Sequence, residues 1–222
     1  MSIEPGTAIA IVGGTGKEGK GLALRWAKAG YRIIIGSRQS EKALAAVQEV
    51  KNRLEDGDIM GMTNQEAVQL AEIVVVTVPY SAHRETLEGL KDALQGKLVV
   101  DVTVPLVPPR VTHVQMPPAG SASQEAAEIL GQGVQVITAF QNISFEHLLR
   151  DEFTDCDVLV CGTNKTARET GIELVKAAGL WGWDAGPIEN AVVVEGLTSV
   201  LIGLNKQYGV QSAGIRITGI KR

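Results

Sequence analysis

Short apolar runs recur along the chain, each followed by a turn or by a segment with helical spacing. The first, Ala8-Ile9-Ala10-Ile11-Val12, ends in glycine, which is typical of a parallel strand buried on both faces. Further runs predict strands at residues 32–36, 73–78, 98–102, 134–139 and 158–161, with a weaker one near Trp183. Strands that alternate with helices in this way predict a doubly wound, mostly parallel α/β sheet.

Apolar positions at helical spacing predict the helices between these strands, for example at residues 22–29 and 44–54. Thr63 and Glu66 have the spacing of a capping box, in which both side chains satisfy free N–H groups at a helix start. From residue 189 to 208 a denser apolar pattern predicts a helix that is buried on more than one side. We expect that helix to pack against another subunit.

Prolines are concentrated between residues 103 and 123, at positions 105, 108, 109, 117 and 118. They exclude a helix or a central strand, so this segment is predicted to be a long loop. The loop follows a strand whose carboxyl end should face a ligand crevice. It is either a functional lid over that crevice or a surface excursion.

The composition narrows the class of protein. The 222 residues suffice for one α/β domain with at most a small appendage. With 21 basic and 25 acidic residues the net charge is −4, so no large positive field attracts a nucleic acid or an anionic membrane. We find neither a signal-peptide pattern nor an apolar stretch of membrane-spanning length, and we therefore expect a cytoplasmic protein.

The first predicted strand leads directly into a glycine-rich turn. Its sequence, Gly14-Thr15-Gly16-Lys17-Glu18-Gly19, has G-x-G-x-x-G spacing and opens an amphipathic helix, and this context makes the pattern specific for a dinucleotide. Gly14 would permit the tight turn, Gly16 would let the backbone approach the pyrophosphate, and Gly19 would allow close helix packing. Free N–H groups at the helix start would hold the phosphates. The sequence therefore predicts a Rossmann-type dinucleotide site.

The end of the second predicted strand decides between the two nicotinamide dinucleotides. About twenty residues after the fingerprint, an NAD site places an acidic residue against the ribose 2′-hydroxyl, whereas this chain has Ser37 and Arg38. A guanidinium can make charge-assisted bonds to a 2′-phosphate and stack on adenine. Lys42 falls on the same side if a helix begins near Ser40. These residues predict NADP(H), with a solvated basic turn as the alternative.

No side chain stands out as a general acid. Tyr80 and Arg84 have the spacing of the Tyr and Lys of short-chain dehydrogenases, but an arginine cannot act as the proton carrier. The three histidines, His83, His113 and His147, are scattered, and we interpret them as surface or packing residues. Hydride exchange between two bound redox cofactors needs chiefly proximity and orientation. The pattern therefore favours such an exchange over carbonyl reduction.

Metal chemistry is not predicted. Cys156 and Cys161 have neither a redox spacing nor a zinc-ligand spacing, and we interpret them as small buried residues on a strand. No cluster of His, Cys, Asp or Glu has the spacing of metal ligands. We expect chelation to leave the activity unchanged.

Several blocks spread over nearly the whole chain form a recognisable set. They are the fingerprint and following helix at residues 13–25, Gly36-Ser37-Arg38-x-x-x-Lys42, Val78-Pro79, Val104-Pro105, Val160-Cys161-Gly162, Leu180-x-x-x-Asp184-Ala185-Gly186-Pro187-Ile188 and Gly214-Ile215-Arg216. By these blocks the chain resembles the NADPH-dependent reductases of the deazaflavin coenzyme F420, also called F420-dependent NADP oxidoreductases. The last two blocks are the specific ones, because many Rossmann enzymes share glycine fingerprints.

The resemblance implies sites for two cofactors, NADP(H) and coenzyme F420. Thr15, Ser37, Arg38 and Lys42 would surround the 2′-phosphate, and Gly16, Lys17 and Glu18 would offer backbone to the diphosphate. Val78, Pro79 and Tyr80 would line the nicotinamide, and the deazaflavin would lie against Val104, Pro105, Gln141, Asn142, Phe145, Ala213 and Gly214. Family members often carry His where this chain has Gln141, and Gln offers a donor and an acceptor but cannot become charged.

The resemblance also implies an architecture. Residues 1–187 would form an NADP-binding Rossmann domain of the doubly wound α/β type. Residues 188–222 would form a small helical C-terminal part, a helix and a strand that complete the deazaflavin crevice and the interface of a homodimer.

The sequence thus predicts an oxidoreductase that moves a hydride between NADP(H) and F420, in either direction, without a catalytic side chain. Its partners would be small-molecule cofactors, not nucleic acid or membrane. Two alternatives stay open, because a fold does not fix the acceptor. One is an NADPH-dependent reductase of a flavin, a metal chelate or a small carbonyl, and the other is a non-catalytic, NADP-sensing Rossmann protein.

Overall fold

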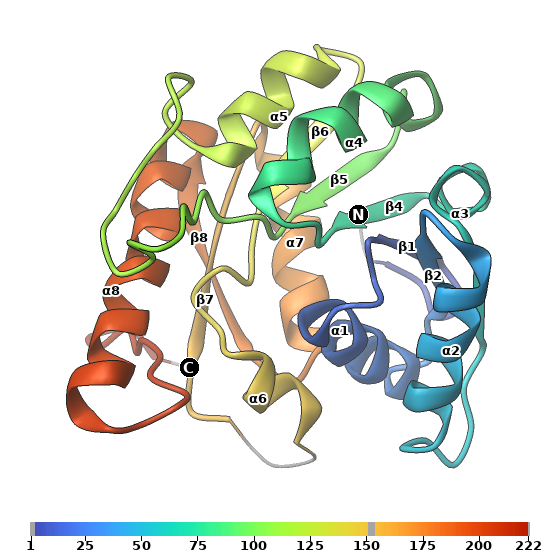
Figure 1. Cartoon of the computed structure of the whole chain (residues 1–222), viewed down its shortest axis with the longest axis horizontal. Coiled ribbons are helices and arrows are strands. Elements are labelled where there is room, and N and C mark those ends of the chain that lie inside the picture. The colour runs from blue at the N-terminus through green and yellow to red at the C-terminus, as the bar shows by residue number, and fades with distance from the viewer. Residues whose placement is uncertain (1–2, 151–153, 222) are drawn as a thin grey trace.

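The computed structural model describes residues 3–150 and 154–221 and arranges the apolar runs in an eight-stranded sheet (Figure 1). The strands are β1 (Ala8–Val12), β2 (Arg32–Ser37), β3 (Ile59–Thr63), β4 (Ile73–Val76), β5 (Leu98–Asp101), β6 (Gln135–Thr138), β7 (Asp157–Gly162) and β8 (Trp181–Pro187). Their order in space is β3-β2-β1-β4-β5-β6-β7-β8. Neighbouring strands are parallel except β6 and β7, which are antiparallel. The predicted fold class is confirmed.

Helices cover both faces of the sheet. They are α1 (Lys17–Lys28), α2 (Ser40–Lys51), α3 (Asn64–Leu70), α4 (Tyr80–Leu94), α5 (Ala122–Leu130), α6 (Phe145–Leu149), α7 (Lys165–Ala177) and α8 (Ala191–Tyr208), with a 3-10 turn at Ile188–Asn190. Alternate residues of β1 enter two separate cores: Ile9 and Ile11 pack with α1, α2 and α7, whereas Ala10 packs with α3, α4 and α5. Figure 1 shows α4 and α5 on one side of the strands and α1 on the other.

One strand, β3, was not among the predicted elements. Its sequence, Ile-Met-Gly-Met-Thr, is only partly buried at the sheet edge and contains a central glycine, so it lacks the continuous apolar signal of the inner strands. That glycine has a packing role, because a Cβ on Gly61 would lie 2.8 Å from the backbone of Ala43 on α2. β4 and β5 are also shorter than predicted and end at Val76 and Asp101, which leaves residues 77–80 and 102–105 as loops beyond the strands.

The predicted capping box is confirmed at the start of α3. Thr63 accepts a hydrogen bond from the Glu66 N–H at 3.3 Å, and the Glu66 carboxylate accepts one from the Thr63 N–H at 2.9 Å. On α2 the apolar face differs from the prediction. Leu44 is 56% exposed, and the buried face begins with Ala43 and Val47, because the edge strand β3 approaches the helix from that side.

The helix predicted at residues 189–208 is α8, and it is less enclosed than predicted. One side is buried, but Val192, Val193, Val200 and Leu204 are each more than one-third exposed. Contrary to the sequence expectation, the segment Ile188–Tyr208 is long and apolar enough to cross a membrane by length and composition. In this fold its Glu195 is fully buried and accepts backbone hydrogen bonds from the start of α5.

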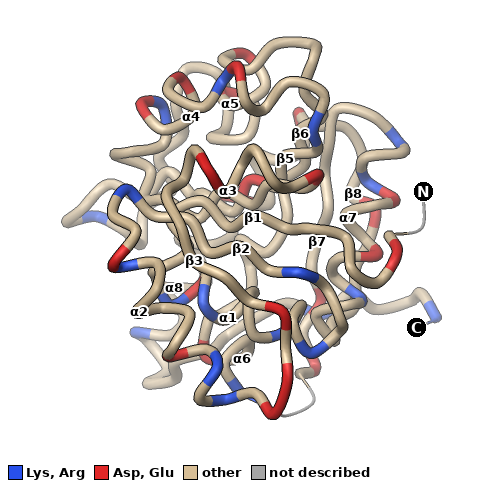
Figure 2. The backbone as a smooth tube through the Cα atoms, turned by 90° about the vertical axis from the view of Figure 1, so that its right-hand side faces the viewer, with Lys and Arg blue, Asp and Glu red and all other residues tan. Residues whose placement is uncertain are grey.

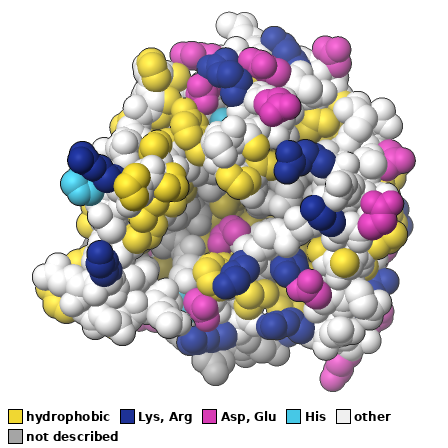
Figure 3. Space-filling model, in the orientation of Figure 1, with side chains coloured by type: hydrophobic (Ala, Val, Ile, Leu, Met, Phe, Trp, Pro, Cys, Tyr) yellow, Lys and Arg dark blue, Asp and Glu magenta, His cyan; other side chains and the backbone are white. Residues whose placement is uncertain are grey.

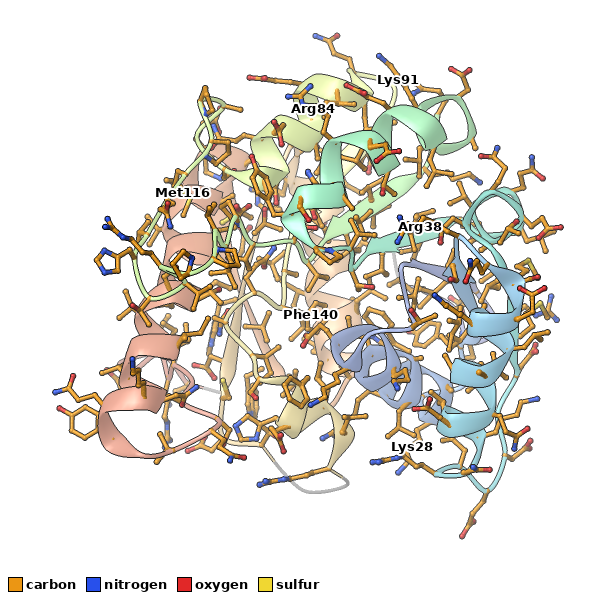
Figure 4. All side chains as sticks on the ribbon, in the orientation of Figure 1. Lys28, Arg38, Arg84, Lys91, Met116 and Phe140 are labelled. Atoms are coloured by element: carbon orange, nitrogen blue, oxygen red, sulfur yellow. The ribbon has the colours of Figure 1, made fainter. Side chains whose placement is uncertain are left out.

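The proline-rich segment is the predicted loop, and it runs along α8 (Figure 1). Small α8 residues bring the two segments together: a Cβ on Gly196 would lie 3.3 Å from Met116, and Ser199 donates a hydrogen bond to the His113 carbonyl at 3.3 Å. Figure 4 shows Met116 beside α8. The loop is therefore held against the C-terminal helix rather than extended into solvent.

The C-terminal segment after α8 differs from the expected strand. Residues 210–221 contain no strand in the described structure. They are nevertheless tied to the start of β7, because the Ile215 carbonyl accepts a hydrogen bond from the Asp157 N–H at 2.9 Å and the Asp157 carboxylate accepts one from the Ile217 N–H at 2.6 Å. The segment therefore lies beside the first residue of β7, beyond the carboxyl end of β6.

Charged residues are interspersed over the molecule. Figure 2 shows basic and acidic positions mixed along the helices and turns, while the strands are largely uncharged. This distribution agrees with the net charge of −4 and shows no face of a single sign in that view.

Candidate functional site

The glycines of the turn after β1 are needed for two different reasons: one for its backbone conformation, the others for the space that a Cβ would fill. Gly13, not Gly14, adopts the left-handed conformation, with φ of +70°, so the predicted turn role of Gly14 is corrected. Gly14 is required for space, since a Cβ there would lie 2.7 Å from the Ile11 carbonyl oxygen. A Cβ on Gly19 would lie 2.6 Å from the Gly14 Cα. The start of α1 thus packs directly on the turn.

The same turn leaves an open place for an anion. A Cβ on Gly16 would meet nothing within 4 Å, and Gly16 is the N-cap of α1 without a side-chain cap. The first N–H groups of a helix have no partner within the helix, and the helix dipole favours negative charge there. Phosphates fit this position.

The residues predicted for the 2′-phosphate lie at the end of β2. Ser37 is the last residue of the strand and is mostly buried. Arg38 and Lys42 are exposed and make no ion pair with any residue in the described ranges, so their charges are available to a ligand. The helix α2 begins at Ser40, as the placement of Lys42 required. Figure 4 shows Arg38 near the start of α2.

Residues 78–80 form one wall beside this turn, which we call the first wall. A Cβ on Gly13 would lie 2.6 Å from the Val78 side chain, so Val78 packs directly against the phosphate loop. Pro79 is the N-cap of α4. Tyr80 is half-buried, with its ring centroid 6.0 Å from that of His83. Burial and the neighbouring Glu125 raise the Tyr80 pKa above 10.0, so the phenol is neutral.

Residues 139–145, between β6 and α6, form a second wall. Phe140 has φ of +74°, an unfavourable conformation for a side chain of this size, and its ring packs edge-on against Trp26 at 5.6 Å. Such strain is often found at functional sites. Phe145 ends this wall, with the Lys17 ammonium 4.6 Å from its ring centroid. Figure 4 shows Phe140 close to the centre of the molecule.

The two amides of the second wall are engaged differently. Asn142 is buried and donates to the Asp157 carbonyl at 2.6 Å, so its side chain fixes β7. Gln141 donates to the Asp101 carbonyl at 2.5 Å, while its Oε1 is buried without a hydrogen-bond partner among the described residues. The Asn142 amide is therefore engaged within the protein, whereas Gln141 Oε1 has no hydrogen-bond partner among the described residues.

The remaining predicted crevice residues lie on two further segments. Val104 and Pro105 follow β5 in the loop that continues along α8. Ala213 donates its N–H to Asn205 at 2.8 Å. A Cβ on Gly214 would lie 2.4 Å from the Cys156 sulfur. A larger residue at position 214 would therefore collide with Cys156.

A buried polar cluster behind the first wall was missed in the sequence. His83 and Asp101 are both fully buried, with His83 Nε2 2.8 Å from Asp101 Oδ2. On the other side, His83 Nδ1 lies 3.6 Å from the Glu125 carboxylate, which Arg84 also contacts at 2.6 Å. Burial lowers the His83 pKa, but Asp101 and Glu125 raise it by more, so the net shift is upward. His83 is a packing residue, as predicted, and its two acidic neighbours favour its protonated form.

Glu195 joins this region from α8. Its carboxylate accepts from the N–H groups of Ala122 and Ser123 at 2.7 and 3.0 Å, and from the Ser123 hydroxyl at 2.9 Å. Burial, with a contribution from Asp101, nevertheless raises its pKa to about 7. Only the apolar surroundings of Glu195 in the sequence could have indicated that this carboxylate is buried.

Glu18 is an unusual residue within the glycine fingerprint. One of its carboxyl oxygens is enclosed and receives no hydrogen bond from any described residue. Burial raises its pKa to about 8. Sequence reasoning assigned only its backbone to the phosphates, whereas the structure adds a neutral carboxyl in the first turn of α1.

The molecular surface is hollowed on one face. Figure 3 shows this hollow in the middle of the face, with hydrophobic and charged side chains around it. In residues 3–150 and 154–221, no group of three or more His, Cys, Asp or Glu could hold a metal ion. Cys156 and Cys161 are buried and form no disulfide, and burial raises the Cys161 pKa to about 11, which makes it a poor nucleophile.

The fold and the phosphate loop define a Rossmann-type dinucleotide-binding protein. A family model described as "NADP oxidoreductase coenzyme F420-dependent" matches residues 8–105. An F420-dependent NADP reductase of Methanothermobacter marburgensis is 43% identical over 96% of this chain and 98% of its own length. Another, of Methanocaldococcus jannaschii, is 39% identical over 96% of this chain and 99% of its own. The chain belongs to the family of F420-dependent NADP reductases.

Solved structures show the same fold at greater distance. An imine reductase from Bacillus cereus superposes with a TM-score of 0.60 at 17% identity. The match covers 91% of this chain, which spans 60% of the length of that reductase. At this identity the likeness concerns the fold alone.

Proposed function

We propose that this protein transfers a hydride between NADP(H) and coenzyme F420. The observation that carries the proposal is the identity of 43% over 96% of the chain with a protein named as an F420-dependent NADP reductase. That similarity continues well beyond residue 105, where the family model ends. No observation favours a flavin, a metal chelate or a carbonyl as the acceptor, or a purely sensing role.

The residues present fit NADP(H). The open space at Gly16 and the uncapped start of α1 suit the diphosphate, which would lie along Gly14, Thr15, Gly16, Lys17, Glu18 and Gly19. The unpaired cations at the end of β2 suit the 2′-phosphate, which would lie among Ser37, Arg38 and Lys42. Because Val78 packs on Gly13, the first wall of Val78, Pro79 and Tyr80 is the nearest surface for the nicotinamide.

The second wall and the loop after β5 fit a second ring. The residues proposed for F420 are Val104, Pro105, Gln141, Asn142, Phe145, Ala213 and Gly214. Gln141 Oε1 is enclosed and has no hydrogen-bond partner among the described residues, so it can accept from a ring N–H only when the side chain turns towards the ligand. F420, when bound, supplies the ring that accepts or releases the hydride.

The chain's own part in the reaction is orientation. The two walls can hold two planar rings in proximity and exclude water, and such orientation can lower a barrier by several kcal/mol. His83 and Asp101 are fully buried and do not line the hollow, so they cannot supply a proton to a ring. We assign no side chain as a catalytic acid or base.

The assembly and location are also part of the proposal. The exposed apolar residues of α8, among them Val193 and Leu204, would be covered in a homodimer. Residues 1–187 would act as the NADP-binding domain, with residues 188–222 completing the crevice and the dimer interface. Cys156 and Cys161 form no disulfide, which suits a reducing compartment such as the cytoplasm.

The test is direct measurement of hydride transfer. Purified protein incubated with NADPH and oxidised F420 should remove the visible absorbance of the oxidised deazaflavin, and NADP with reduced F420 should restore it. NADH is the matched control donor, and FMN is the matched control acceptor. Oxidation of NADPH with FMN but not with F420 would contradict the proposal.

A further inference from the structure

A buried carboxylate, Asp101, contacts three separate segments of the site. It is the last residue of β5 and is fully buried. Its side chain reaches α4, because Oδ2 lies 2.8 Å from His83 Nε2, and it reaches the following loop, because Oδ1 accepts the Thr103 N–H at 3.0 Å. Its carbonyl accepts from the Gln141 side chain at 2.5 Å. We call these four residues the Asp101 cluster.

Each partner belongs to an element that carries part of the site. His83 stands on α4, whose N-terminus holds the first wall at residues 78–80. Thr103 directly precedes Val104, and its hydroxyl donates to the Val78 carbonyl at 3.4 Å. Gln141 is part of the second wall, and its carbonyl accepts from Thr198 of α8 at 2.7 Å. The cluster therefore connects the two walls through fully buried groups.

A row of acidic and basic groups continues from the cluster to the surface. His83 lies between Asp101 and Glu125, and Glu125 is paired again with Arg84 at the surface. Glu195 is a further buried carboxylate near Asp101 and raises the negative charge of this region. Buried charges need such pairing, so His83 is held between its two acidic neighbours.

Asp101 is not placed to donate a proton to a bound ring. Both carboxylate oxygens already have partners, one in His83 and one in the Thr103 N–H. The residue has no exposed surface, so it touches no ligand in the hollow. An effect of Asp101 on the reaction would act through the walls it fixes.

We propose that Asp101 is a positioning residue that sets the separation of the two walls, and thereby the distance between the two bound rings, by holding α4, the loop after β5 and Gln141 to one buried carboxylate. The inference rests on the proposed function, since it concerns the transfer between those rings. Displacing a reacting group by about 1 Å can cost up to a hundredfold in rate. The phosphate loop follows β1, and the 2′-phosphate residues lie at the end of β2 and on α2. These elements contribute no residue to the cluster, so NADPH affinity is expected to change little when Asp101 is replaced.

The test compares three replacements of Asp101. Asp101→Ala removes both side-chain contacts. Asp101→Ser keeps an oxygen near the Thr103 N–H but is too short to reach His83. Asp101→Asn can still accept from Thr103 and can donate to a neutral His83, so it should rescue the geometry without the charge. Leu174→Ala, fully buried on α7, a helix that carries no wall residue, is the control for lost stability.

Two quantities are measured for every variant well below its melting temperature. One is the Kd for NADPH, from the change in its fluorescence, and the other is the single-turnover rate of hydride transfer to oxidised F420. We expect the rate to fall at least about tenfold in Asp101→Ala, less in Asp101→Ser and little in Asp101→Asn. The NADPH Kd should stay within about threefold throughout, because distant sites act independently.

The outcomes separate this inference from the proposed function. If wild-type protein does not transfer hydride to F420, the proposed function fails, and the inference fails with it. If wild type is active and Asp101→Ala or Asp101→Ser keeps the full rate, only the inference is overturned. It is also overturned if Leu174→Ala loses as much rate as Asp101→Ala, or if the NADPH Kd rises in parallel with the loss of rate. Should Asp101→Ala not fold, Asp101→Ser and Asp101→Asn give the same decision.

Discussion

The two halves of the site are built by different means. The half that holds the phosphates consists of backbone, local turns and exposed cations within residues 13–42, and its main determinants are the space left at Gly14, Gly16 and Gly19. The half that faces it depends on buried side chains from β5, α4, α5 and α8, which meet around Asp101 and Glu195. One half is specified by neighbours in sequence, and the other by residues that are far apart.

Because of this difference, dinucleotide binding and the separation of the two walls depend on different residues. The phosphate half can bind a dinucleotide through groups that need no distant support, because N–H groups at a helix start and an unpaired Arg38 act locally. The opposite half must place two apolar walls at a fixed separation. That separation depends on buried polar groups such as His83 and Asp101. Replacing either one is costly, because the other is then left buried without its partner.

The largest expected effect is therefore on the free energy of unfolding, and it comes from a replacement in the half built around Asp101 and Glu195. His83→Leu should lower the free energy of unfolding by about 3–5 kcal/mol, because it leaves Asp101 buried without its cationic partner. Lys20→Ala, which breaks the ion pair with Glu49 in the phosphate half, should cost no more than about 1 kcal/mol. Urea unfolding of both variants checks the comparison. Equal losses would mean that the buried pair is no stronger a constraint than a surface one.

The same histidine gives that stability a pH dependence. Burial lowers the His83 pKa and the two carboxylates raise it by more, so the folded state holds its proton above the ordinary value of 6.5. The contribution of His83 to stability is then complete below that value and is lost as the pH rises through the folded pKa. The difference in unfolding free energy between wild type and His83→Leu should shrink on the alkaline side. A difference that grows with pH would contradict a charged His83.

The second prediction concerns the phosphate half. Arg38→Ala should weaken NADPH binding by about 1.5–3 kcal/mol, the range for a hydrogen bond to a charged group, and should leave NADH binding unchanged. Arg32→Ala is a matched control on the same strand, at the end away from the phosphate loop, where Arg32 pairs with Asp58. Titration of each variant with both dinucleotides provides the measurement. An equal loss for NADH and NADPH would remove Arg38 from the 2′-phosphate site.

The two halves also explain how far prediction from sequence reached. The strands β1, β2 and β4 to β7, the glycine turn and the capping box at Thr63 could be predicted, because each depends on neighbouring residues. The edge strand β3 and the exposed face of α8 could not, since their burial depends on which elements pack beside them. The pairing of His83 with Asp101 lies across 18 residues, and no local pattern indicates it. The roles assigned to individual site residues remain predictions.

The third prediction concerns the charge of Glu18 in the phosphate half and its effect on NADPH affinity. Burial raises the Glu18 pKa to about 8, so its carboxyl is neutral at pH 7 and does not oppose the diphosphate. As the pH rises above 8 the carboxylate forms in the first turn of α1 and repels the phosphates, so NADPH affinity should fall by up to about tenfold by pH 9. Glu18→Gln should remove this decline. If the variant keeps the same pH dependence, another group is responsible.

The smallest effects are expected for polar residues beside the crevice that the buried cluster does not use. Tyr80 is half-buried with a neutral phenol, His147 Nε2 donates to the Ser212 carbonyl at 3.0 Å, and the His113 side chain is exposed. If hydride transfer needs only oriented rings, the accompanying proton comes from water. Tyr80→Phe, His147→Gln and His113→Gln should then each keep single-turnover rates within about tenfold of wild type, under 1.4 kcal/mol. A thousandfold loss in any one of them, with the Kd of both cofactors unchanged, would identify a specific proton donor. The crevice half would then contribute chemistry as well as geometry, and a carbonyl compound would become the better candidate for the acceptor.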